Sequence, residues 1–310
     1  MKIVISEFMD EVAVASLRRE FEVVYDPAGV DHPEVLHAQL ADADALIVRN
    51  RTQVRGPLLA AGARLRVVGR LGVGLDNIDL AACQARAIPV IPAAGANAQA
   101  VAEYVVCTAM TLLRGAYQST GAMVACQWPR VALSSGREIA GQCLGLIGFG
   151  FIGQRTAQLA QALGMQVIAH DPMLAPDHAV WAQSGVRCAS FEDVLAQADV
   201  ISLHVPLLPG TAGLMSASAL ARMKPDAILI NTSRGGIVDE AAVAAALRAS
   251  RLGGAALDVF ENEPFGPEHP WTDCPRLILT PHVAGLSAQA NVRVSTMIAT
   301  EVSKVLKAKH

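Results

Sequence analysis

The feature that most constrains the fold is a glycine-rich run placed where an apolar strand should give way to a helix. Residues 143–147 form a short apolar run. The sequence Gly148-Phe-Gly150-Phe-Ile-Gly153 follows it directly and precedes a stretch whose apolar residues recur with helical spacing. In a G-x-G-x-x-G pattern at such a junction, the first glycine permits a tight turn and the second lets the backbone approach a pyrophosphate. The third lets the helix pack closely on the strand, while the pyrophosphate rests on N–H groups at the helix N-terminus. The pattern indicates a dinucleotide-binding unit, although an ordinary glycine-rich turn would carry the same letters.

The rest of the chain repeats a rhythm of short β-branched runs and longer stretches rich in Ala and Leu. This alternation is typical of βαβ units that build a parallel sheet. The predicted strands are Lys2–Ser6, Glu22–Tyr25, Ala45–Val48, Val67–Gly69, Val90–Ile91, Cys143–Ile147, Gln166–His170, Val200–His204, Ala227–Asn231, Gly254–Asp258 and Leu277–Leu279. The predicted helices include Asp31–Asp42, Asp79–Ala87, Asn97–Met123, Ile152–Leu163, Phe191–Gln197, Glu240–Ser250 and Ser287–Lys307. We therefore expect an α/β protein with two series of strands, of which only the second opens with the glycine pattern.

The composition describes a compact globular protein, with 52% hydrophobic and 17% charged residues. The net charge is −3, and no block of like charge favours nucleic acid or an anionic membrane as a partner. No apolar run reaches membrane-spanning length, and the N-terminus resembles no secretion signal. The six cysteines have no paired spacing, which predicts buried, reduced side chains. Together these features predict a cytoplasmic protein with no nucleic-acid or membrane partner.

An acidic residue after the second strand of the dinucleotide unit indicates which dinucleotide is bound. Asp171 lies 21 residues after Gly150, at the end of a predicted strand. A carboxylate there can accept hydrogen bonds from the adenosine ribose hydroxyls and would repel a 2′-phosphate. Residues 172–174 contain no Lys or Arg to attract that phosphate. We therefore predict NAD rather than NADP as the cofactor, with a mere turn or capping role for Asp171 as the alternative.

Five ordered motifs carry a resemblance to a known family. They occupy residues 72–79, 204–211, 231–240, 257–264 and 280–285. Together they resemble the signature of the D-isomer-specific 2-hydroxyacid dehydrogenases, a family that includes phosphoglycerate dehydrogenases, glyoxylate and hydroxypyruvate reductases, and D-lactate dehydrogenases. A weaker overall likeness is to the sulfolactate dehydrogenases within it. The resemblance covers essentially the whole chain and is much more specific than the glycine pattern alone.

The resemblance implies three catalytic residues whose chemistry is reasonable. His282 would give a proton to the substrate oxygen as hydride reaches the carbon, because imidazole titrates near neutral pH. Glu263 would hydrogen-bond the other ring nitrogen, fix the tautomer and stabilise the protonated ring. Arg234 would bind the substrate carboxylate through its planar fork and polarise the adjacent carbonyl. Taken singly, each residue also has a structural explanation, as a turn histidine, a solvated loop carboxylate or a strand cap.

The same resemblance implies further contacts with the cofactor. Asp258 should contact the nicotinamide carboxamide, with Thr232 nearby, and His204 should line the adenine side unless it is a satisfied core histidine. The complete set of predicted cofactor-binding residues is Gly148, Gly150, Phe151, Ile152, Gly153, Asp171, His204, Val205, Pro206, Thr211, Thr232, Asp258 and Gly285. The histidines outside the motifs lack metal-ligand spacing, so we predict no catalytic metal.

Two segments of the first domain are expected to bind substrate. Gly72, Val73 and Gly74 look like the family loop whose backbone N–H groups hold the substrate carboxylate, the alternative being a simple strand-to-helix turn. Arg49 lies where several family members present a residue to the distal end of the substrate. Asn50 and Arg51 depart from the phosphoglycerate dehydrogenase pattern, which has Ser after the first Arg. Our hypothesis is that Arg49, either alone or with Arg51, binds a second anionic group, and the alternative is a pair of solvated surface arginines.

These inferences combine into one predicted architecture. Two Rossmann-like domains are expected, with an NAD-binding domain (99–285) inserted into a smaller, flavodoxin-like substrate-binding (lid) domain (1–98 and 286–310). The apolar helix 97–123 must bury more than one face, by packing between the domains, against a second subunit, or both. Together with the family resemblance, this predicts a homodimer.

The predicted function is hydride transfer between NAD(H) and a small 2-hydroxy or 2-keto acid. The rival is a non-catalytic NAD-binding sensor or corepressor on the same scaffold, which would not need the three catalytic residues. NAD-dependent chemistry on an aldehyde or amino acid is disfavoured, because it would leave Arg234 and the 72–74 loop without an anion to bind.

Overall fold

The computed structural model describes residues 1–308, and the chain divides into two compact units. Unit 1 comprises Met1–Asn97 and Leu286–His310, and unit 2 comprises Ala98–Gly285. The last two positions of the predicted substrate domain lie outside the described residues. The sequence of unit 2 therefore interrupts that of unit 1.

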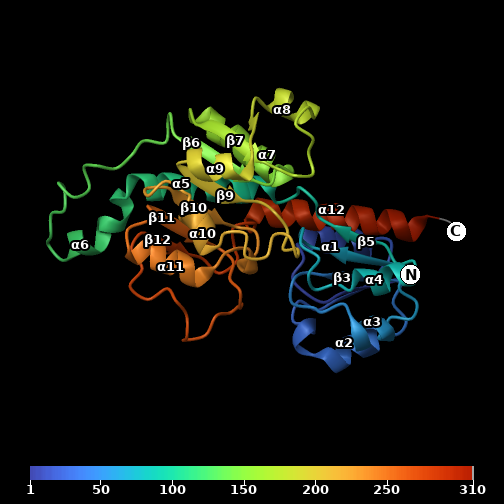
Figure 1. The fold of residues 1–310 in the computed structure, drawn as a ribbon. Helices are drawn as coiled ribbons and strands as arrows, with labels where there is room; N and C mark the ends of the chain where they lie inside the picture. The colour runs from blue at the N-terminus through green and yellow to red at the C-terminus, as the bar shows by residue number, and fades with distance from the viewer. Residues whose placement is uncertain (309–310) are drawn as a thin grey trace. The chain divides into compact units, whose positions relative to one another are not determined.

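Unit 1 is built on a five-stranded parallel sheet with helices on both faces (Figure 1). Its strand order is β2-β1-β3-β4-β5, the flavodoxin-like order. The strands are β1 (Lys2–Ile5), β2 (Glu22–Tyr25), β3 (Ala45–Val48), β4 (Val67–Arg70) and β5 (Val90–Pro92). The helices are α1 (Glu11–Arg18), α2 (Pro33–Leu40), α3 (Gly56–Ala61), α4 (Leu80–Ala85), α12 (Ala288–Lys307) and the 3₁₀ turn η1 (Gly29–Asp31).

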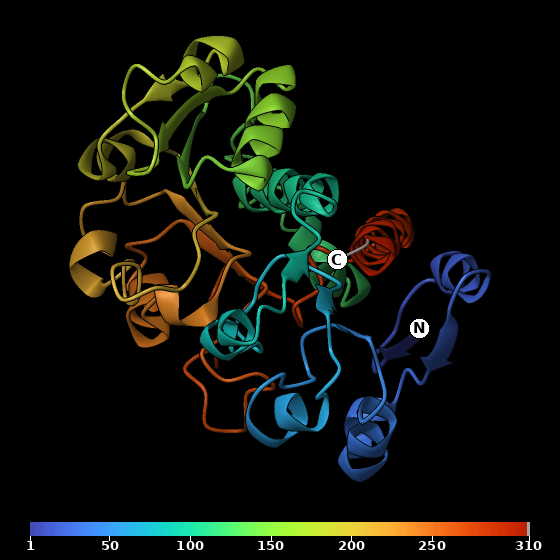
Figure 2. The ribbon, with the colours of Figure 1, turned by 90° about the vertical axis from the view of Figure 1, so that its right-hand side faces the viewer.

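Successive residues of the central strands of unit 1 enter two separate cores. In β1, Ile3 packs with α1 and α12, whereas Val4 packs with α2, α3 and α4. In β4, a Cβ on Gly69 would lie 2.7 Å from Ile298 Cγ2, so α12 rests directly on the sheet; Figure 2 shows this helix (red) nearly end-on. Burial on both faces explains why these strands read as continuous apolar runs.

Unit 2 is built on a seven-stranded parallel sheet of order β12-β11-β10-β9-β6-β7-β8. The strands are β6 (Cys143–Ile147), β7 (Gln166–His170), β8 (Arg187–Cys188), β9 (Val200–Leu203), β10 (Ile228–Asn231), β11 (Gly254–Leu257) and β12 (Leu277–Leu279). The helices are α5 (Ala98–Arg114), α6 (Thr120–Val124), α7 (Phe151–Ala162), α8 (Ala179–Ser184), α9 (Phe191–Gln197), α10 (Ala217–Leu220) and α11 (Glu240–Arg248). Two 3₁₀ turns, η2 (Ala116–Ser119) and η3 (Gly235–Ile237), complete the unit.

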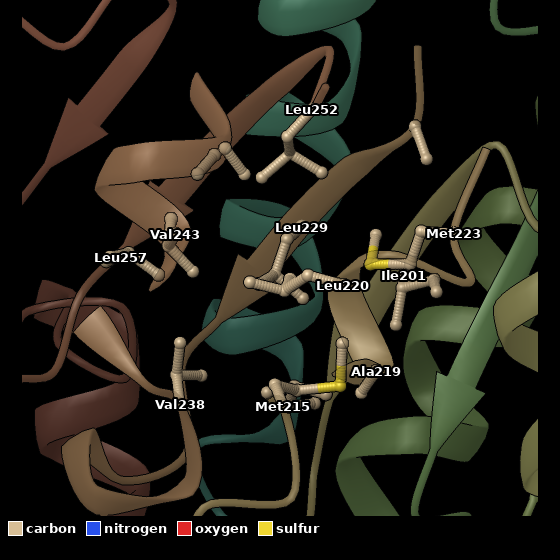
Figure 3. Packing of buried hydrophobic residues seen from close by; sticks show 14 of the residues in the cluster. Ile201, Met215, Ala219, Leu220, Met223, Leu229, Val238, Val243, Leu252 and Leu257 are labelled. Carbon is tan, nitrogen blue, oxygen red and sulfur yellow. The ribbon is translucent and has the colours of Figure 1, made fainter. Parts of the chain in front are cut away.

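The sheet of unit 2 also has a core on each face. One core joins the sheet to α5 and α7, and the other joins it to α9, α10 and α11. Figure 3 shows the second core, where Leu229 of β10 packs near Leu220 and Leu257 of β11 packs near Val243. The strand order is the doubly wound order of dinucleotide-binding sheets with one further strand. The two sheets confirm the predicted α/β class with two Rossmann-like units.

The predicted long helix over residues 97–123 was wrong in one respect. The structure ends α5 at Arg114, and η2 and α6 follow as separate short pieces. The break falls at Gly115, which has a φ of +67°. A left-handed residue of this kind terminates a helix, and glycine adopts it without a Cβ penalty. The continuous apolar composition through this region concealed the break.

The six cysteines are free thiols in the structure. The expectation that all are buried holds for Cys83, is only partly met by the half-buried Cys143, Cys188 and Cys274, and was wrong for Cys107 and Cys126, which are exposed. Within residues 1–308, no helix has the length and apolar character needed to cross a membrane.

Candidate active site

The predicted site residues of unit 2 gather at one edge of its sheet. The glycine loop follows β6, His204 follows β9, Arg234 follows β10, Asp258 follows β11 and His282 follows β12. All these strands are parallel and adjacent in the sheet, so their carboxyl ends form a single edge. Doubly wound sheets bind ligands at this edge.

The three glycines of the loop have three different environments. Gly148 has a φ of +95°, and a Cβ there would lie 2.5 Å from the carbonyl oxygen of His204. A Cβ on Gly153 would lie 2.4 Å from the carbonyl oxygen of Gly148, so α7 packs too closely for any side chain. A Cβ on Gly150 would meet nothing within 4 Å. The first and third glycines are therefore required by packing, whereas the second faces open space.

Two side chains at the start of α7 differ in exposure. Phe151 is exposed and Ile152 packs on the core beneath the sheet. Asp171, at the end of β7, accepts hydrogen bonds from the N–H of Phe149 at 2.8 Å and of Met173 at 3.0 Å. Each carboxylate oxygen has a further lone pair, so Asp171 can support the glycine loop and still accept from a ligand.

The segment after β9 is fixed by its own side chains. His204 Nε2 lies 3.0 Å from Ser202 Oγ, and burial lowers the pKa of the His204 ring to about 3, which keeps it neutral. The Thr211 hydroxyl accepts from the N–H of Leu208 at 2.8 Å and donates to the carbonyl of Pro206 at 2.5 Å. Thr211 thus shapes this loop from within.

A histidine–carboxylate pair lies at the carboxyl end of β12. His282 Nδ1 is 2.6 Å from Glu263 Oε2, and both side chains are partly exposed. The other Glu263 oxygen accepts from the N–H of Phe260 at 2.9 Å. Burial alone would raise the pKa of Glu263. These hydrogen bonds, together with the electrostatic effects of His282 and Arg234, outweigh burial and hold the pKa below its ordinary value, so Glu263 is ionised.

The backbone at His282 is held in an uncommon conformation. Its φ is +56°, which costs a residue with a side chain on the order of 1 kcal/mol. Asp258, only 1% exposed, stabilises this turn: its carboxylate accepts from the N–H groups of residues 283–284 at 2.8 and 2.7 Å, and its carbonyl accepts from His282 N–H at 2.8 Å. Thr280 Oγ1 donates to the same carboxylate at 2.6 Å and lies 2.6 Å from the hydroxyl of Tyr104 on α5. The turn ends at Gly285, the last residue of unit 2.

Sequence reasoning missed this second role of Asp258, and it missed Tyr104 and Thr280 altogether. The available signal was the Thr280-Pro-His282 order, which places a hydroxyl two residues before the imidazole. Neither the distance to Asp258 nor the contact with α5 can be read from that order.

The Arg234 turn is packed backbone to backbone against the loop that carries Glu263. A Cβ on Gly235 would lie 1.9 Å from the carbonyl carbon of Phe260. We expect Gly235→Ala to lower the free energy of unfolding by about 3 kcal/mol, since backbone atoms on both sides cannot yield. Activity should fall with it, because the loop bearing Glu263 must move. Denaturant titration and steady-state kinetics of the folded fraction measure the two effects.

The neighbouring glycine provides the control for that prediction. A Cβ on Gly236 would meet only the methyl ends of Leu207, at 3.3 and 3.5 Å. Gly236→Ala should therefore change stability by less than about 1 kcal/mol. Equal stability losses for the two variants would contradict the close packing at Gly235.

In unit 1, the predicted substrate residues follow β3 and β4. Gly72 has a φ of +154°, and a Cβ there would lie 1.7 Å from Arg70 Nη1. Across residues 1–308, the N–H groups of Val73 and Gly74 have no hydrogen-bond acceptor. Arg49 Nη2 donates to Asn291 Oδ1 at 2.7 Å.

Arg49 and Arg51 differ in what surrounds them. The Arg49 guanidinium carbon lies 5.5 Å from the centre of the Phe8 ring, and burial lowers its pKa although Glu7 opposes the shift. Arg51 instead forms an exposed ion pair with Asp31. The structure therefore separates the two arginines, and only Arg49 is held by groups that leave part of its fork available. No three His, Cys, Asp or Glu side chains in the described chain are grouped so as to hold a metal ion.

Comparisons with known proteins agree over nearly the whole chain. A sequence model described as "D-isomer specific 2-hydroxyacid dehydrogenase, NAD binding domain" matches residues 106–284. The chain is 51% identical over 304 residues to (S)-sulfolactate dehydrogenase of Chromohalobacter salexigens, covering 98% of each protein. It is 39% identical over 306 residues to D-3-phosphoglycerate dehydrogenase of Mycobacterium leprae. That match covers 98% of this chain and 56% of the relative, so the chain spans little more than half of that protein's length.

The fold is similar to those of solved enzymes as well. A glyoxylate reductase from Paecilomyes thermophila superposes with a TM-score of 0.87 at 26% sequence identity, over 99% of this chain and 95% of that one. The family match spans more than half of the chain, and the relatives are dehydrogenases that align along its length. These matches identify the chain as an NAD-dependent oxidoreductase that acts on CH–OH donors. The chain belongs to the D-isomer-specific 2-hydroxyacid dehydrogenase family.

Proposed function

We propose that this protein interconverts a 2-keto acid and a 2-hydroxy acid with His282 as general acid and base, Glu263 as its orienting partner and Arg234 as the carboxylate-binding residue. The observation that carries the proposal is the 2.6 Å contact between His282 and Glu263, with the charge of Arg234 acting on the same carboxylate. A His–carboxylate pair beside a guanidinium is the set of groups that keto acid reduction requires.

In the proposed mechanism each side chain has one task. NAD, when bound, supplies the acceptor for a hydride, and NADH supplies the donor. Glu263 at Nδ1 leaves Nε2 of His282 to face the substrate oxygen, where it gives a proton during reduction and takes one during oxidation. Because its lowered pKa keeps Glu263 ionised, its charge can stabilise the imidazolium form of His282 in the proton-transfer step. Arg234 binds the carboxylate through two N–H groups, which fixes the carbon to be reduced.

The residues at this edge fit a bound dinucleotide. The open space above Gly150 admits a pyrophosphate that any Cβ would obstruct. In the described part of the chain, Thr232 Oγ1 is buried without a hydrogen-bond partner, and a buried hydroxyl of this kind requires one. Asp171 and Asp258 retain acceptor capacity for ribose and carboxamide groups. We propose that these residues, with the other predicted cofactor residues, hold NAD.

The rival function is an NAD-binding sensor or corepressor without catalysis. Such a protein would need the glycine loop and Asp171 but not an acid–base pair. Here Glu263 is bonded to His282 and to the Phe260 N–H, and Asp258 fixes the His282 turn. Several interactions therefore orient the single imidazole of His282, which a sensor would not require, and this favours the enzyme.

For the substrate side, we propose that unit 1 is the substrate-binding (lid) domain. The supporting observation is the pair of N–H groups at Val73 and Gly74, which in the described chain have no acceptor. Successive backbone N–H groups of this kind bind carboxylates. The positive φ of Gly72 gives the loop its shape.

The proposed substrate has a second anionic group, and sulfolactate with its keto acid, 3-sulfopyruvate, is the first candidate. Arg49 is the proposed ligand of that group, because Asn291 and Phe8 hold its guanidinium while Arg51 is engaged by Asp31. The 51% identity to an (S)-sulfolactate dehydrogenase supports the choice of a sulfonate.

The D label in the family name and the (S) label of the sulfolactate dehydrogenase describe the same spatial arrangement at the hydroxyl-bearing carbon. In lactate the carboxylate outranks the methyl group, so the D isomer is R. In sulfolactate the sulfur-bearing carbon outranks the carboxylate, so the same spatial arrangement is named S.

Replacing Arg49 with Ala tests the distal anion site. We expect KM for 3-sulfopyruvate to rise about 10- to 100-fold, the worth of one or two hydrogen bonds to a charged group. The kcat/KM for glyoxylate, which has no second anion, should change by less than about twofold. Arg64→Ala is the matched control, since Arg64 pairs with Asp44 at the opposite edge of the same sheet. Equal losses for both substrates in Arg49→Ala would reject the site.

A homodimer through an apolar surface of unit 2 is also proposed. A cavity of about 630 Å³ with mostly apolar walls is lined by Met110 of α5, Tyr117 of η2, residues of α7 and Leu163, which directly follows α7. The segment after α5 adds Val124 and Trp128, which are 79% and 74% exposed, and Figure 1 shows α6 and the chain after it (green) extending from the unit. Apolar surface of this extent indicates a protein interface.

Sedimentation measures this assembly directly. We expect a mass of two chains for the wild type and a shift toward one chain for Met110→Asp, because a charge in the interface would be buried without a partner. Val12→Asp is the control, since Val12 is equally apolar and 70% exposed on α1 of unit 1. A monomeric wild type at micromolar concentration would contradict the proposal.

A further inference from the structure

The loop that carries Arg49 lies between two other loops of unit 1. It follows β3, and the sheet order places β3 between β1 and β4. Residues after β1 and β4 therefore flank the Arg49–Thr52 loop at the carboxyl edge of the sheet. These neighbours contribute buried polar side chains to it, Glu7 and Ser6 from the β1 side and Asn77 from the β4 side.

Glu7 binds the loop through its backbone N–H groups. Its carboxylate is 4% exposed and accepts from the N–H of Arg49 at 2.8 Å, of Arg51 at 3.1 Å and of Thr52 at 3.0 Å. Burying a carboxylate costs several kcal/mol unless hydrogen bonds replace its water. Three amide donors from one short loop provide that replacement.

Asn77 binds the same loop through its carbonyl groups. Its side chain is 5% exposed, and Nδ2 donates to the carbonyls of Arg49 at 3.1 Å and of Thr52 at 2.7 Å. The hydroxyl of Thr52 also lies 2.9 Å from that of Ser6. The loop has no regular secondary structure, yet both ends of its backbone are fixed by side chains.

The Arg49 side chain is then set by the neighbouring residues. Phe8, which follows Glu7 in the chain, lies under the guanidinium, and Asn291 of α12 accepts one of its N–H groups. A loop that is ordered before binding avoids the entropy cost of ordering when the ligand arrives.

We infer that Glu7 and Asn77 are positioning residues that preorganise Arg49 for the distal anion of the substrate. Neither side chain needs to touch substrate, because both act through the backbone of residues 49–52. The inference rests on the proposed substrate class. Selectivity for a second anionic group then depends on the buried Glu7 and Asn77 as well as on Arg49 itself.

The test compares Glu7→Gln with Asp44→Asn. Both remove one buried carboxylate from unit 1, and Asp44 likewise accepts a backbone N–H, from Lys2 at 2.7 Å, but at the opposite edge of the sheet. Glu7→Gln should raise KM for 3-sulfopyruvate about tenfold with kcat within about twofold, the worth of one hydrogen bond to a charged group. The kcat/KM for glyoxylate should stay within about twofold. Asp44→Asn should leave the ratio of the two substrates unchanged.

A double-mutant cycle shows whether Glu7 acts through Arg49. In the Arg49→Ala background, Glu7→Gln should leave KM for 3-sulfopyruvate unchanged, because the residue being positioned is gone. Glu7→Asp should restore part of the selectivity. Undiminished effects in the double variant, or equal losses for both substrates, would overturn the inference.

A separate readout distinguishes failure of this inference from failure of the proposed function. If the wild type does not prefer 3-sulfopyruvate to glyoxylate, the proposed substrate class fails. Amide hydrogen exchange of the peptide containing residues 49–52 still tests whether Glu7 holds this loop. Exchange should become faster in Glu7→Gln and not in Asp44→Asn, and unchanged exchange in Glu7→Gln would overturn the positioning role of Glu7.

Discussion

Replacing His282 with Asn is expected to lower kcat for keto acid reduction by about 10²- to 10⁴-fold, the usual contribution of a positioned general acid. Asparagine keeps a side chain of moderate size and can accept a hydrogen bond, but it has no proton to give at neutral pH. The affinity for NADH, measured by its fluorescence, should change little, since the glycine loop and Asp171 lie at other strand ends. Loss of activity with intact cofactor binding would assign the defect to proton transfer.

Glu263→Gln is a milder change to the same acid–base pair and should slow the reaction less than His282→Asn. It keeps His282 but removes the carboxylate that lies 2.6 Å from Nδ1. The lowered pKa of Glu263 means that this charge is present throughout the neutral range and is lost only below the ordinary carboxyl pKa. Without it, reduction should be slower and should fall off at a lower pH than in the wild type, whereas oxidation should persist to lower pH. Full activity of His282→Asn would show that another group supplies the proton.

Replacing Arg234 with Lys is expected to lower kcat/KM for every 2-keto acid about a hundredfold. Lysine keeps the charge but replaces a planar fork with a single point donor, so one charge-assisted hydrogen bond worth up to about 3 kcal/mol is lost. The loss should be the same for 3-sulfopyruvate and glyoxylate, because both have the carboxylate that is the proposed ligand of Arg234. This uniform loss contrasts with Arg49→Ala, which should affect only the substrate with a second anion.

Guanidinium rescue is the control for Arg234. Adding free guanidinium ion to Arg234→Ala should restore part of the activity if the missing group acts on substrate. A variant that lost activity through misfolding would not respond. A selective loss for one of the two substrates in Arg234→Lys would contradict its assignment to the common carboxylate.

Much of this fold could be predicted because the strands are buried on both faces. Short apolar runs such as Cys143–Ile147 and Gln166–His170 stand out from their surroundings, and their observed bounds match the predicted ones. The edge strand β8, with only Arg187 and Cys188, carries no such pattern and was not predicted. The break at Gly115 was missed because one glycine within an apolar helical pattern usually costs only about 1 kcal/mol.

In the candidate site, too, some residues could be predicted from local motifs and others could not. His282, Glu263 and Arg234 follow strands within recognisable motifs, so their common place at one edge of the sheet could be predicted, and their catalytic roles stay predictions. Glu7 was not predicted, because its role depends on a loop more than 40 residues later in the chain. Asp258 was assigned to the cofactor alone, since no pattern reveals that its carboxylate holds the turn at His282. Contacts of this kind follow from sheet order, which single motifs do not contain.

Loss of NADH absorbance measures directly whether the residues at the His282 edge reduce a carbonyl adjacent to a carboxylate. The substrates compared are 3-sulfopyruvate, glyoxylate and pyruvate, beside a simple aldehyde that has no carboxylate. We expect turnover with the three 2-oxo acids and almost none with the aldehyde, because only the acids provide an anion for the proposed site at Arg234. Turnover of the aldehyde at a comparable rate, or no turnover of any 2-oxo acid by a protein that still binds NADH, would show that this reaction is wrongly assigned.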